Sequence, residues 1–410
     1  MQPTESQMGH NLRRARPKRF WLFLLTAIAV STSGAVFVAA PKITSSWWWR
    51  THVTHPECAG ADATVSRSVL ALDPPQLLAT GVATGLQTPT SLAAMPNGNL
   101  LITEKPGVLT ILNLVDGSRA TVADLKSIVK SSDDNGLISV VVHPNYGVDG
   151  EERIFLFYNE LPDSSIVVAS AKLNSSQRIL PDDLTTLQKF PHVSTSHSGG
   201  AMVFLSDDEL LVSTGDDMKG SNSQSEEIFL GKMLTIDPDV PGQQPVVIAL
   251  GLRNPVHVTL SPNKDTLWVA DVGSNCVEEV NRIPLTGEST SVTNFGWPFY
   301  EGELVLKKKS TLVDDSSLTA PIYTYAHEKG VCAVIGGAFL ANWYIFADYC
   351  DGSIRGLPLD AAPKTKAAKL LNLNGLGKRV GIVAISGDEL GRVWVLDGWG
   401  GTIYRLEATP

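Results

Sequence analysis

Residues 393–406, VWVLDGWGGTIYRL, contain the clearest copy of the repeated pattern from which the fold is predicted. Two short runs of β-branched and aromatic residues, 393–396 and 402–406, are separated by Asp and Gly, which predicts a β-hairpin. Two further hairpins and three further copies of the first strand follow the same pattern: 100–103 with 108–111, 267–270 with 277–283, and strands that begin at Arg153, Leu210 and Trp343. Six copies at spacings of roughly 50 to 75 residues predict the blades of a propeller.

The predicted fold class is therefore all-β, a six-bladed β-propeller of four-stranded antiparallel blades over residues 76–410. A single four-stranded blade cannot bury its faces alone, whereas six blades around an axis share one core and leave few exposed edges. Helical periodicity is confined to short pieces such as 121–131. An α/β fold built on crossover helices is therefore a poor competitor.

The N-terminal region predicts three segments before the propeller. Residues 1–19 form a basic tail, and residues 20–40 are 21 apolar positions without charge, enough to span a bilayer as a helix. Residues 41–75 read as a stalk. We expect an uncleaved transmembrane signal anchor with a cytoplasmic N-terminus. A cleaved signal peptide is the alternative, and either interpretation places the propeller outside the cytoplasm.

The charge and the cysteines narrow the choice of partners. A formal net charge of -9 argues against nucleic acid, because phosphate binding requires a basic field. A neutral small molecule or a protein partner fits better. Four cysteines in an exported chain allow three pairings in two disulfides. We favour Cys332 with Cys350, since only 17 residues lie between them and they flank two predicted neighbouring strands.

Loops at the channel mouth of a propeller bring together side chains from several blades, and they are the usual place for a ligand. Unusual residues in such loops are candidates for a site. The stretches that qualify are 135–138, 197–200, 215–217, 251–255, 271–273 with 278–281, 294–298 with 301–302, 336–337 and 346–349.

In these stretches and in their order, the chain resembles the glucose/sorbosone dehydrogenase family, over about residues 78–406. That family includes soluble quinoprotein aldose dehydrogenases and the propeller domain of Hedgehog-interacting proteins. The resemblance implies an enzyme that uses pyrroloquinoline quinone (PQQ) and Ca²⁺ to oxidise the anomeric carbon of an aldose sugar. It also implies that electrons pass to an external acceptor.

The resemblance assigns roles to three polar residues. His197 matches the general base that takes the proton of the sugar hydroxyl, a role that suits an imidazole. Arg253 matches a catalytic residue that also contacts the quinone, and Asn254 matches its neighbour in cofactor binding. A fixed cation and an amide donor would stabilise negative charge on the quinone oxygens.

The metal ligands implied by the resemblance are mostly backbone carbonyls. Gly273 and Ser274 match positions whose carbonyls hold the Ca²⁺ of the cofactor, and a hard cation held in this way needs no conspicuous carboxylate cluster. Glu279 and the carbonyl of Phe295 are candidates for a second, structural Ca²⁺.

The chain departs from the family pattern at several positions. Asn135, a predicted cofactor contact, stands where many active relatives carry Gln or Glu, and Ser196 stands where some carry a carboxylate beside the base. Lys378 and Arg379 are the only substitutes near the last blade for a basic cluster that would neutralise the three PQQ carboxylates. Without partners, three buried carboxylates are costly.

Each candidate also has a structural interpretation. His197 would be a turn residue, and Arg253 would tie a buried loop by donating to backbone carbonyls. Asp216 and Asp217 would brace a tight turn. The aromatic side chains would be blade core rather than a substrate platform: Phe295, Trp297 and Tyr349.

Three functions follow from these alternatives. The first is the PQQ- and calcium-dependent dehydrogenase, and the second is a non-catalytic propeller that binds a protein or carbohydrate at its channel mouth. A hydrolase or lactonase centred on Ca²⁺ is the third, although its usual inward-facing Glu and Asn set is not evident. Convergence of His197, Arg253 and the Gly273 carbonyl on one face would favour a cofactor site.

Overall fold

A computed structural model of the chain describes residue 58 and residues 74–174, 178–285, 292–306, 317–327, 330–363, 365–373 and 380–409. They belong to one compact unit, Thr44–Pro410. The predicted basic tail and the predicted anchor at residues 20–40 lie outside the described residues. Within the ranges that are described, no helix has the length and apolar character needed to cross a membrane.

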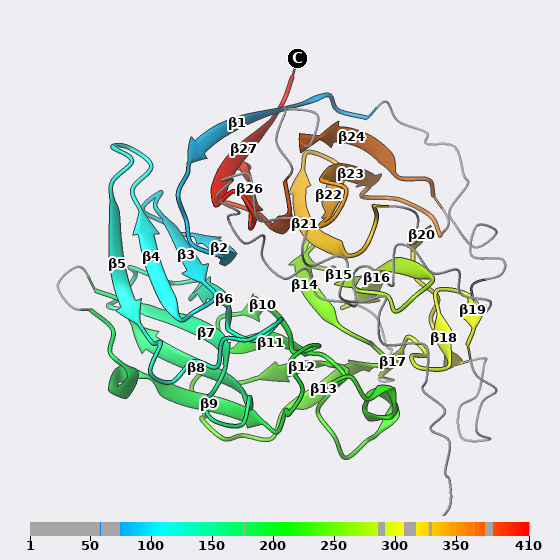
Figure 1. The fold of residues 1–410 in the computed structure, drawn as a ribbon, viewed down its shortest axis with the longest axis horizontal. Coiled ribbons are helices and arrows are strands. Elements are labelled where there is room, and N and C mark those ends of the chain that lie inside the picture. The colour runs from blue at the N-terminus through cyan, green and yellow to red at the C-terminus, as the bar shows by residue number, and fades with distance from the viewer. Residues whose placement is uncertain are drawn as a thin grey trace, which may run out of the picture. The chain divides into compact units, whose positions relative to one another are not determined.

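Six four-stranded antiparallel sheets form the blades, and each begins with its innermost strand (Figure 1). Blade 1 contains β2 (Pro89–Ala94), β3 (Leu100–Glu104), β4 (Val108–Leu112) and β5 (Arg119–Asp124). Blade 2 contains β6 (Leu137–Val142), β7 (Arg153–Asn159), β8 (Ile166–Lys172) and β9 (Thr185–Phe190). Blade 3 contains β10 (Gly199–Ser206), β11 (Glu209–Thr214), β12 (Lys232–Ile236) and β13 (Val246–Leu250), with the short β17 (Thr293–Asn294) added in parallel.

The other three blades repeat this order. Blade 4 contains β14 (Pro255–Leu260), β15 (Thr266–Asp271), β16 (Val277–Pro284) and β20 (Tyr323–Ala326). Blade 5 contains β21 (Val334–Leu340), β22 (Trp343–Asp348), β23 (Ser353–Pro358) and β24 (Ala368–Asn372). Blade 6 contains β25 (Ile382–Gly387), β26 (Val393–Asp397), β27 (Thr402–Ala408) and β1 (Leu77–Ala83). Among the described residues, the hairpin of β18 (Tyr300–Glu301) and β19 (Leu304–Val305) lies outside the blades, as do the 3₁₀ turns η2 (Pro181–Asp183) and η3 (Gly220–Gln224).

The innermost strands close a ring, because each packs against the innermost strand of the next blade, and β25 of blade 6 packs against β2 of blade 1. The ring is also closed within blade 6, where β1 pairs antiparallel with β27 so that Leu77 faces Ala408. The predicted six-bladed propeller is therefore confirmed. The six repeated first strands of the predicted pattern are second strands of blades: β3, β7, β11, β15, β22 and β26. The three partner strands named from the sequence are third strands of their blades: β4, β16 and β27.

The expectation of helical character at residues 121–131 is wrong. Residues up to Asp124 belong to strand β5, and turns follow it. Pairing of β5 with β4 overrides the local periodicity, because the strand hydrogen bonds and the buried Ala123 require an extended chain here.

A polar side chain at the end of the second strand braces most blades. Its oxygen accepts a backbone N–H from the segment just before the innermost strand of the same blade. The pairs are Glu104 with Gln87 (3.0 Å), Asn159 with Gly136 (3.2 Å), Asp271 with Arg253 and Asn254 (2.9 and 2.6 Å), Asp348 with Cys332 and Ala333 (3.2 and 3.3 Å) and Asp397 with Gly381 (3.1 Å). We call this contact the strand-end brace. Blade 3 differs, since Thr214 ends its second strand.

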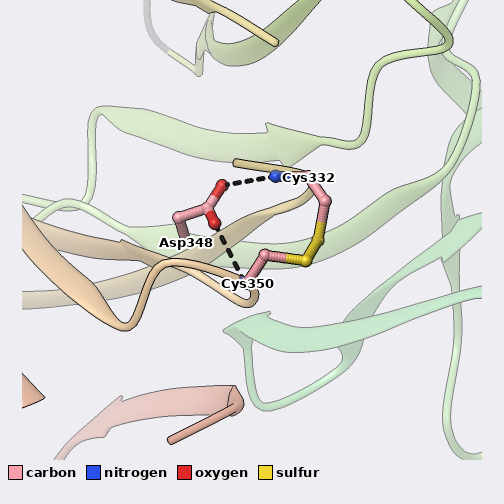
Figure 2. A group of neighbouring side chains, drawn as sticks. All are labelled: Cys332, Asp348 and Cys350. Carbon is pink, nitrogen blue, oxygen red and sulfur yellow. Dashed lines mark hydrogen bonds between the residues drawn. A yellow bond between two sulfur atoms is a disulfide. The ribbon is translucent and has the colours of Figure 1, made fainter. Parts of the chain in front are cut away.

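The predicted disulfide between Cys332 and Cys350 is confirmed, and Cys58 with Cys276 forms the second one. The buried Asp348 lies beside the first disulfide and accepts N–H bonds from both of its cysteines (Figure 2). The two sulfur atoms are bonded to each other, so this group of Cys and Asp side chains is a braced disulfide rather than a metal site.

Candidate functional site

The predicted site residues lie on one face of the propeller because of where the blades place their loops. Asn135, His197 and Arg253 stand directly before the innermost strands β6, β10 and β14. Gly273 follows the second strand β15. In an antiparallel blade the start of the first strand and the end of the second strand are at the same edge. His197, Arg253 and Gly273 therefore share one face, as a cofactor site requires.

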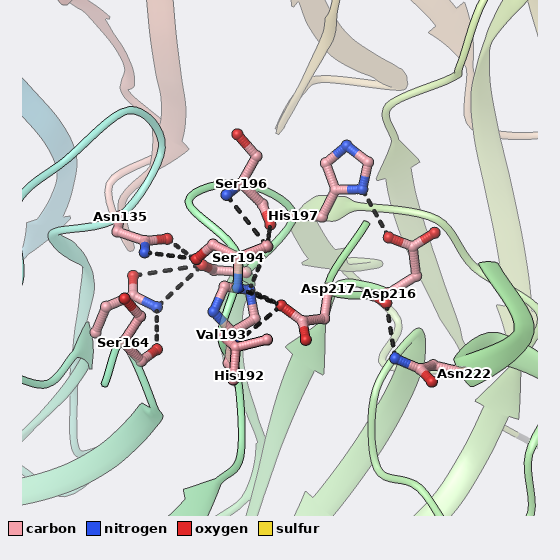
Figure 3. A network of polar contacts seen from close by, with 12 residues as sticks. Asn135, Ser164, His192, Val193, Ser194, Ser196, His197, Asp216, Asp217 and Asn222 are labelled. Atoms are coloured by element: carbon pink, nitrogen blue, oxygen red, sulfur yellow. Dashed lines mark hydrogen bonds and ion pairs between the residues drawn. The ribbon is translucent and has the colours of Figure 1, made fainter. Parts of the chain in front are cut away.

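His197 forms a buried pair with Asp216. Its Nδ1 lies 2.6 Å from Oδ1 of Asp216, and both residues are largely buried (Figure 3). The backbone of His197 has φ of +63°, in the left-handed region that few side chains adopt. Gly215 makes this approach possible, since a Cβ there would lie 2.1 Å from the carbonyl oxygen of His197.

The charge environment favours a neutral imidazole at His197. Burial lowers the pKa of His197, and the nearby Arg253 cation lowers it further, while Asp216 opposes both effects. An ionised carboxylate only accepts hydrogen bonds, so Nδ1 carries the proton and Nε2 has its lone pair available. A neutral imidazole oriented in this way is suited to accept a proton.

Arg253 reaches the same group from blade 4. Its guanidinium lies over the ring of Trp297 at 5.6 Å, and its Nη1 donates to the carbonyl of Val272 at 2.9 Å. The indole Nε1 of Trp297 donates to Oδ2 of Asp216 at 2.8 Å. The carboxylate of Asp216 therefore contacts both the imidazole of His197 and the indole of Trp297, and the indole ring packs against the guanidinium of Arg253.

Asn254 links blades 3 and 4. Its Oδ1 accepts the N–H of Gly199 at 3.0 Å, just after His197, while its own N–H donates to Asp271 at 2.6 Å. Asn254 thereby supplies from blade 4 the strand-end brace that Thr214 does not supply in blade 3. With Oδ1 engaged, the side chain presents its amide Nδ2 as a donor.

Asn135 is fully buried and faces the loop of His197. Its Nδ2 donates to the carbonyl of Ser194 at 3.0 Å, and its Oδ1 accepts from the hydroxyl of Ser198 at 3.1 Å (Figure 3). Both ends of the side chain therefore support the loop, and its assignment as a cofactor contact stays a prediction.

A model of the family described as Glucose / Sorbosone dehydrogenase matches residues 86–405. The chain belongs to this family. The match extends through all six blades except strand β1 of blade 6, and it agrees with the resemblance inferred from the loop stretches.

Relatives in sequence and in fold include aldose sugar dehydrogenases. The aldose sugar dehydrogenase YliI of Escherichia coli K12 is 27% identical over 276 residues, 62% of this chain and 71% of that protein. The PQQ-bound aldose sugar dehydrogenase of Streptomyces coelicolor has a TM-score of 0.66 at 21% identity, covering 82% of this chain and 99% of that one. A calcium structure of a Trichoderma reesei AA12 enzyme has a TM-score of 0.63 at 14% identity, covering 82% and 97%. The two structural likenesses show a shared fold.

Within this member of the family, Asp216 and Asp217 have different roles. Asp217 braces the loop before His197, as predicted, because its Oδ1 accepts the N–H groups of Val193 (3.1 Å) and Ser194 (2.8 Å) (Figure 3). For Asp216 the prediction of a turn brace is wrong, since its carboxylate is bound by His197 and Trp297. The sequence contained a signal, the Gly-Asp-Asp run after strand β11, but only the fold brings its partners to it.

The two predicted metal ligands in the 273–277 loop are well placed to present carbonyls. The N–H groups of 274–277 all donate to Oε1 of the buried Glu301, at 2.7 to 3.1 Å. In a planar trans peptide the carbonyl points opposite to the N–H. The carbonyls of Gly273 and Ser274 therefore point away from Glu301. This orientation fits a Ca²⁺ ligand role. Glu301 belongs to a stretch singled out from the sequence, but its role in holding this loop was not predicted.

Glu279 lies in a group of buried acids. Burial raises its pKa to about 8, helped by the nearby Asp271 and Glu301 carboxylates. Oε2 of Glu301 and Oδ1 of Asn281 are buried and have no hydrogen-bond partner among the described residues. Oxygen atoms in this state fit a cation, which would stabilise the ionised acids.

The remaining candidate residues lie in the core, in the site or outside the described residues. The side chain of Phe295 is buried in the core between blades 3 and 4, as predicted, so only its carbonyl is a candidate ligand. Trp297 is part of the site rather than of the blade core, which corrects the prediction. Lys378 and Arg379 lie outside the described residues.

Proposed function

We propose that this chain is a PQQ- and calcium-dependent dehydrogenase that oxidises the anomeric carbon of an aldose sugar. The observation that carries the proposal is the buried pair of His197 and Asp216, at 2.6 Å, with Arg253 held over Trp297 beside it. A base oriented by a carboxylate next to a fixed cation is the arrangement that sugar oxidation requires. Family membership and the aldose sugar dehydrogenase relative support the same reaction.

His197 is the proposed general base. With Nδ1 engaged by Asp216, Nε2 takes the proton of the anomeric hydroxyl as the C–H bond breaks. Asp216 holds the ring in place and stabilises the imidazolium that forms. PQQ, when bound, supplies the two-electron acceptor for the hydride from the anomeric carbon.

Arg253 and the Nδ2 of Asn254 would orient the quinone and stabilise negative charge on its oxygens. The backbone of both residues is held in place, since their N–H groups donate to the carboxylate of Asp271 at 2.9 and 2.6 Å. The carbonyls of Gly273 and Ser274 would hold the Ca²⁺ of the cofactor.

Two further groups complete the proposed cofactor site. Glu279 and the carbonyl of Phe295 would hold a structural Ca²⁺, with Glu301 and Asn281 as adjacent oxygen ligands. Lys378 and Arg379 would neutralise carboxylates of PQQ, because a tricarboxylate needs cations besides Arg253.

The proposed location is outside the cytoplasm. The two disulfides support an oxidising compartment. Residues 20–40 would anchor the chain through a single membrane-spanning segment, followed by the stalk 41–75 and the propeller 76–410. Electrons would then pass to an acceptor external to the chain.

The test is calorimetric titration of PQQ with Ca²⁺ into the full chain in mild detergent, followed by dye-linked oxidation of a panel of aldoses. We expect binding and turnover for the wild type, and binding without turnover for His197→Ala. A folded wild-type chain that binds neither PQQ nor sugar would contradict the proposal and favour a propeller that binds a protein partner at its channel mouth.

A further inference from the structure

Lys232 is a buried cation beneath the candidate site. It is the first residue of β12, and only 1% of its surface is exposed. Its Nζ donates to the carbonyls of Asn222 (2.8 Å), Ser223 (3.0 Å) and Leu230 (2.9 Å). An ammonium group has three hydrogens, and each of them has an acceptor here. Two of these acceptors belong to η3, so Lys232 fixes the backbone of this 3₁₀ turn.

The side chains of η3 in turn hold two loops of the site. The Nδ2 of Asn222 donates to the carbonyl of Asp216 at 3.0 Å (Figure 3). The hydroxyl of Ser223 donates to the carbonyl of Leu252 at 2.6 Å, directly before Arg253. Consecutive residues of one short turn thus hold the carboxylate partner of the base and the site cation.

Gln224 holds the third loop. Its Nε2 donates to the carbonyl of Trp297 at 2.7 Å and to Oδ1 of Asn294 at 3.0 Å, and its Oε1 accepts from Nδ2 of Asn294 at 2.9 Å. Trp297 is the residue that joins Asp216 to Arg253. The loops that carry Asp216, Arg253 and Trp297 are therefore each held by a side chain of η3.

The packing around η3 leaves little room for movement. A Cβ at Gly231 would lie 2.2 Å from the hydroxyl oxygen of Ser223, and a Cβ at Gly251 would lie 2.8 Å from Nε2 of Gln224. Both glycines also have positive φ. In a close-packed interior a displaced turn moves its neighbours, so a shift of η3 would reach all three loops.

We propose that Lys232 is a positioning residue of the candidate site. Its ammonium group fixes η3, and through Asn222, Ser223 and Gln224 it sets the positions of Asp216, Arg253 and Trp297. The effect on turnover rests on the proposed dehydrogenase function, whereas the effect on the geometry of the site does not.

Burial of this amine has a further consequence. It lowers the pKa of Lys232 to about 8, since the surroundings offer carbonyl dipoles in place of water. Replacement of Lys232 by Met would remove the ammonium donor shared by three carbonyls; those of Asn222 and Ser223 would keep only their backbone donors, Ser225 and Gly251, which disfavours the observed position of η3.

The experiment compares Lys232→Met with Arg355→Met, which removes a cation in blade 5 whose side chain is only 13% exposed. Arg355 lies 4.0 Å from the ring of Tyr325 and donates to Asp351 at 3.0 Å, away from η3. In the full chain without cofactor, NMR would follow hydrogen exchange at the Trp297 indole N–H and the titration of the His197 imidazole. We expect Lys232→Met to accelerate indole exchange about tenfold or more, because the bond to Asp216 loosens.

The same variant is expected to lower the pH at which His197 titrates, because Asp216 favours its protonated form. Arg355→Met should reduce the melting temperature but leave both signals at their wild-type values. With a sugar that is oxidised, we expect kcat of Lys232→Met to fall at least about tenfold with KM nearly unchanged.

Lys232→Gln and Asn222→Ala provide variants with smaller perturbations, should Lys232→Met fail to fold. Each is expected to change the two NMR signals in the same direction. The proposal is overturned if the folded Lys232 variants lose only melting temperature, as Arg355→Met does, and keep wild-type exchange and titration. Absence of turnover in the wild type would contradict the proposed function but would leave these NMR outcomes decisive.

Discussion

Blades 3 and 5 use a carboxylate near the end of the second strand in opposite ways. In blade 5, Asp348 ends β22, and both of its oxygens accept N–H groups of the flanking loops. In blade 3 the strand ends at Thr214, and the acid follows two residues later as Asp216, bound by side chains of the site. Asn254 of the next blade supplies the missing brace.

The difference shows how a repeat acquires a site. A brace that satisfies backbone N–H groups stabilises the fold but leaves no carboxylate oxygen for chemistry. Once the brace comes from Asn254, the carboxylate of Asp216 is available to His197. Departures from a repeat that are compensated by a neighbouring element are where functional residues are expected.

The largest expected effect is on turnover, from Asp216→Asn. This change removes the charge that holds and stabilises the imidazole of His197, and we expect kcat to fall by about 10²- to 10⁴-fold. Steady-state oxidation of an aldose measures it, with thermal unfolding as the control for folding. If kcat of the folded variant were within a few-fold of wild type, the proposed role of Asp216 in orienting and stabilising the His197 imidazole would be contradicted, and its role would be structural.

Asp348→Ala should show the opposite profile. Its removal leaves four backbone N–H groups, two of them on the buried Cys332 and Cys350, and the Tyr325 hydroxyl without this acceptor, and we expect a loss of about 3–5 kcal/mol in the free energy of unfolding. Denaturant unfolding measures this loss. Turnover per folded molecule should stay near wild type, and a selective loss of kcat would contradict the structural role assigned to blade 5.

Asn254→Ala is expected to combine both effects at intermediate size. The N–H of Gly199 loses its acceptor, which should reduce the free energy of unfolding by about 1–3 kcal/mol. The same change removes the Nδ2 donor proposed for the quinone, so turnover should fall as well. A variant with unchanged stability would show that the brace in blade 3 does not depend on Asn254.

The smallest expected effect is a displacement of the acid limb of the pH profile. His197 must be neutral to act as a base, and burial together with Arg253 lowers its pKa below the ordinary value. Activity should therefore be kept as the pH falls to about 6.5 and be lost below it. In residual turnover of Asp216→Asn, the limb should move to still lower pH, because the raising effect of Asp216 is absent. A shift to higher pH would show that another group is titrating.

Much of the fold was predictable from local patterns. The second strand of every blade is continuously apolar and ends at a turn, as at Val393–Asp397, because both of its faces are buried between neighbouring blades. The pairing of Cys332 with Cys350 was predicted because only 17 residues separate them along the sequence and because they flank two predicted neighbouring strands. By contrast, the run at 121–131 appeared helical because periodicity alone does not include the partner strand β4.

Candidate site residues could be named from the sequence only where the resemblance to the family supplied a role, as for His197, Arg253 and Gly273. The role of Asp216 depends on His197, 19 positions away, and on Trp297, 81 positions away, and that of Glu301 on contacts across 24 to 27 positions. Lys232 makes its contacts 2 to 10 positions away, but only the folded structure shows that its ammonium group lies among those carbonyls. Asp216 and Asp217 are neighbours of identical chemistry, and no local pattern distinguishes the one that binds the imidazole from the one that braces the loop.

The class of fold, the number of blades and the family could be read from the sequence, because most strands of each blade follow one another along the chain and the copies recur every 50 to 75 residues. Which polar side chains meet was settled only by the folded chain. Closure of the ring brings the loop before one blade against the loops of the next, and a hydrogen bond depends on that distance rather than on order along the chain. The bond of Asn254 with Gly199 exists for this reason, whereas the pairing of β10 with β11 inside blade 3 brings His197 to Asp216.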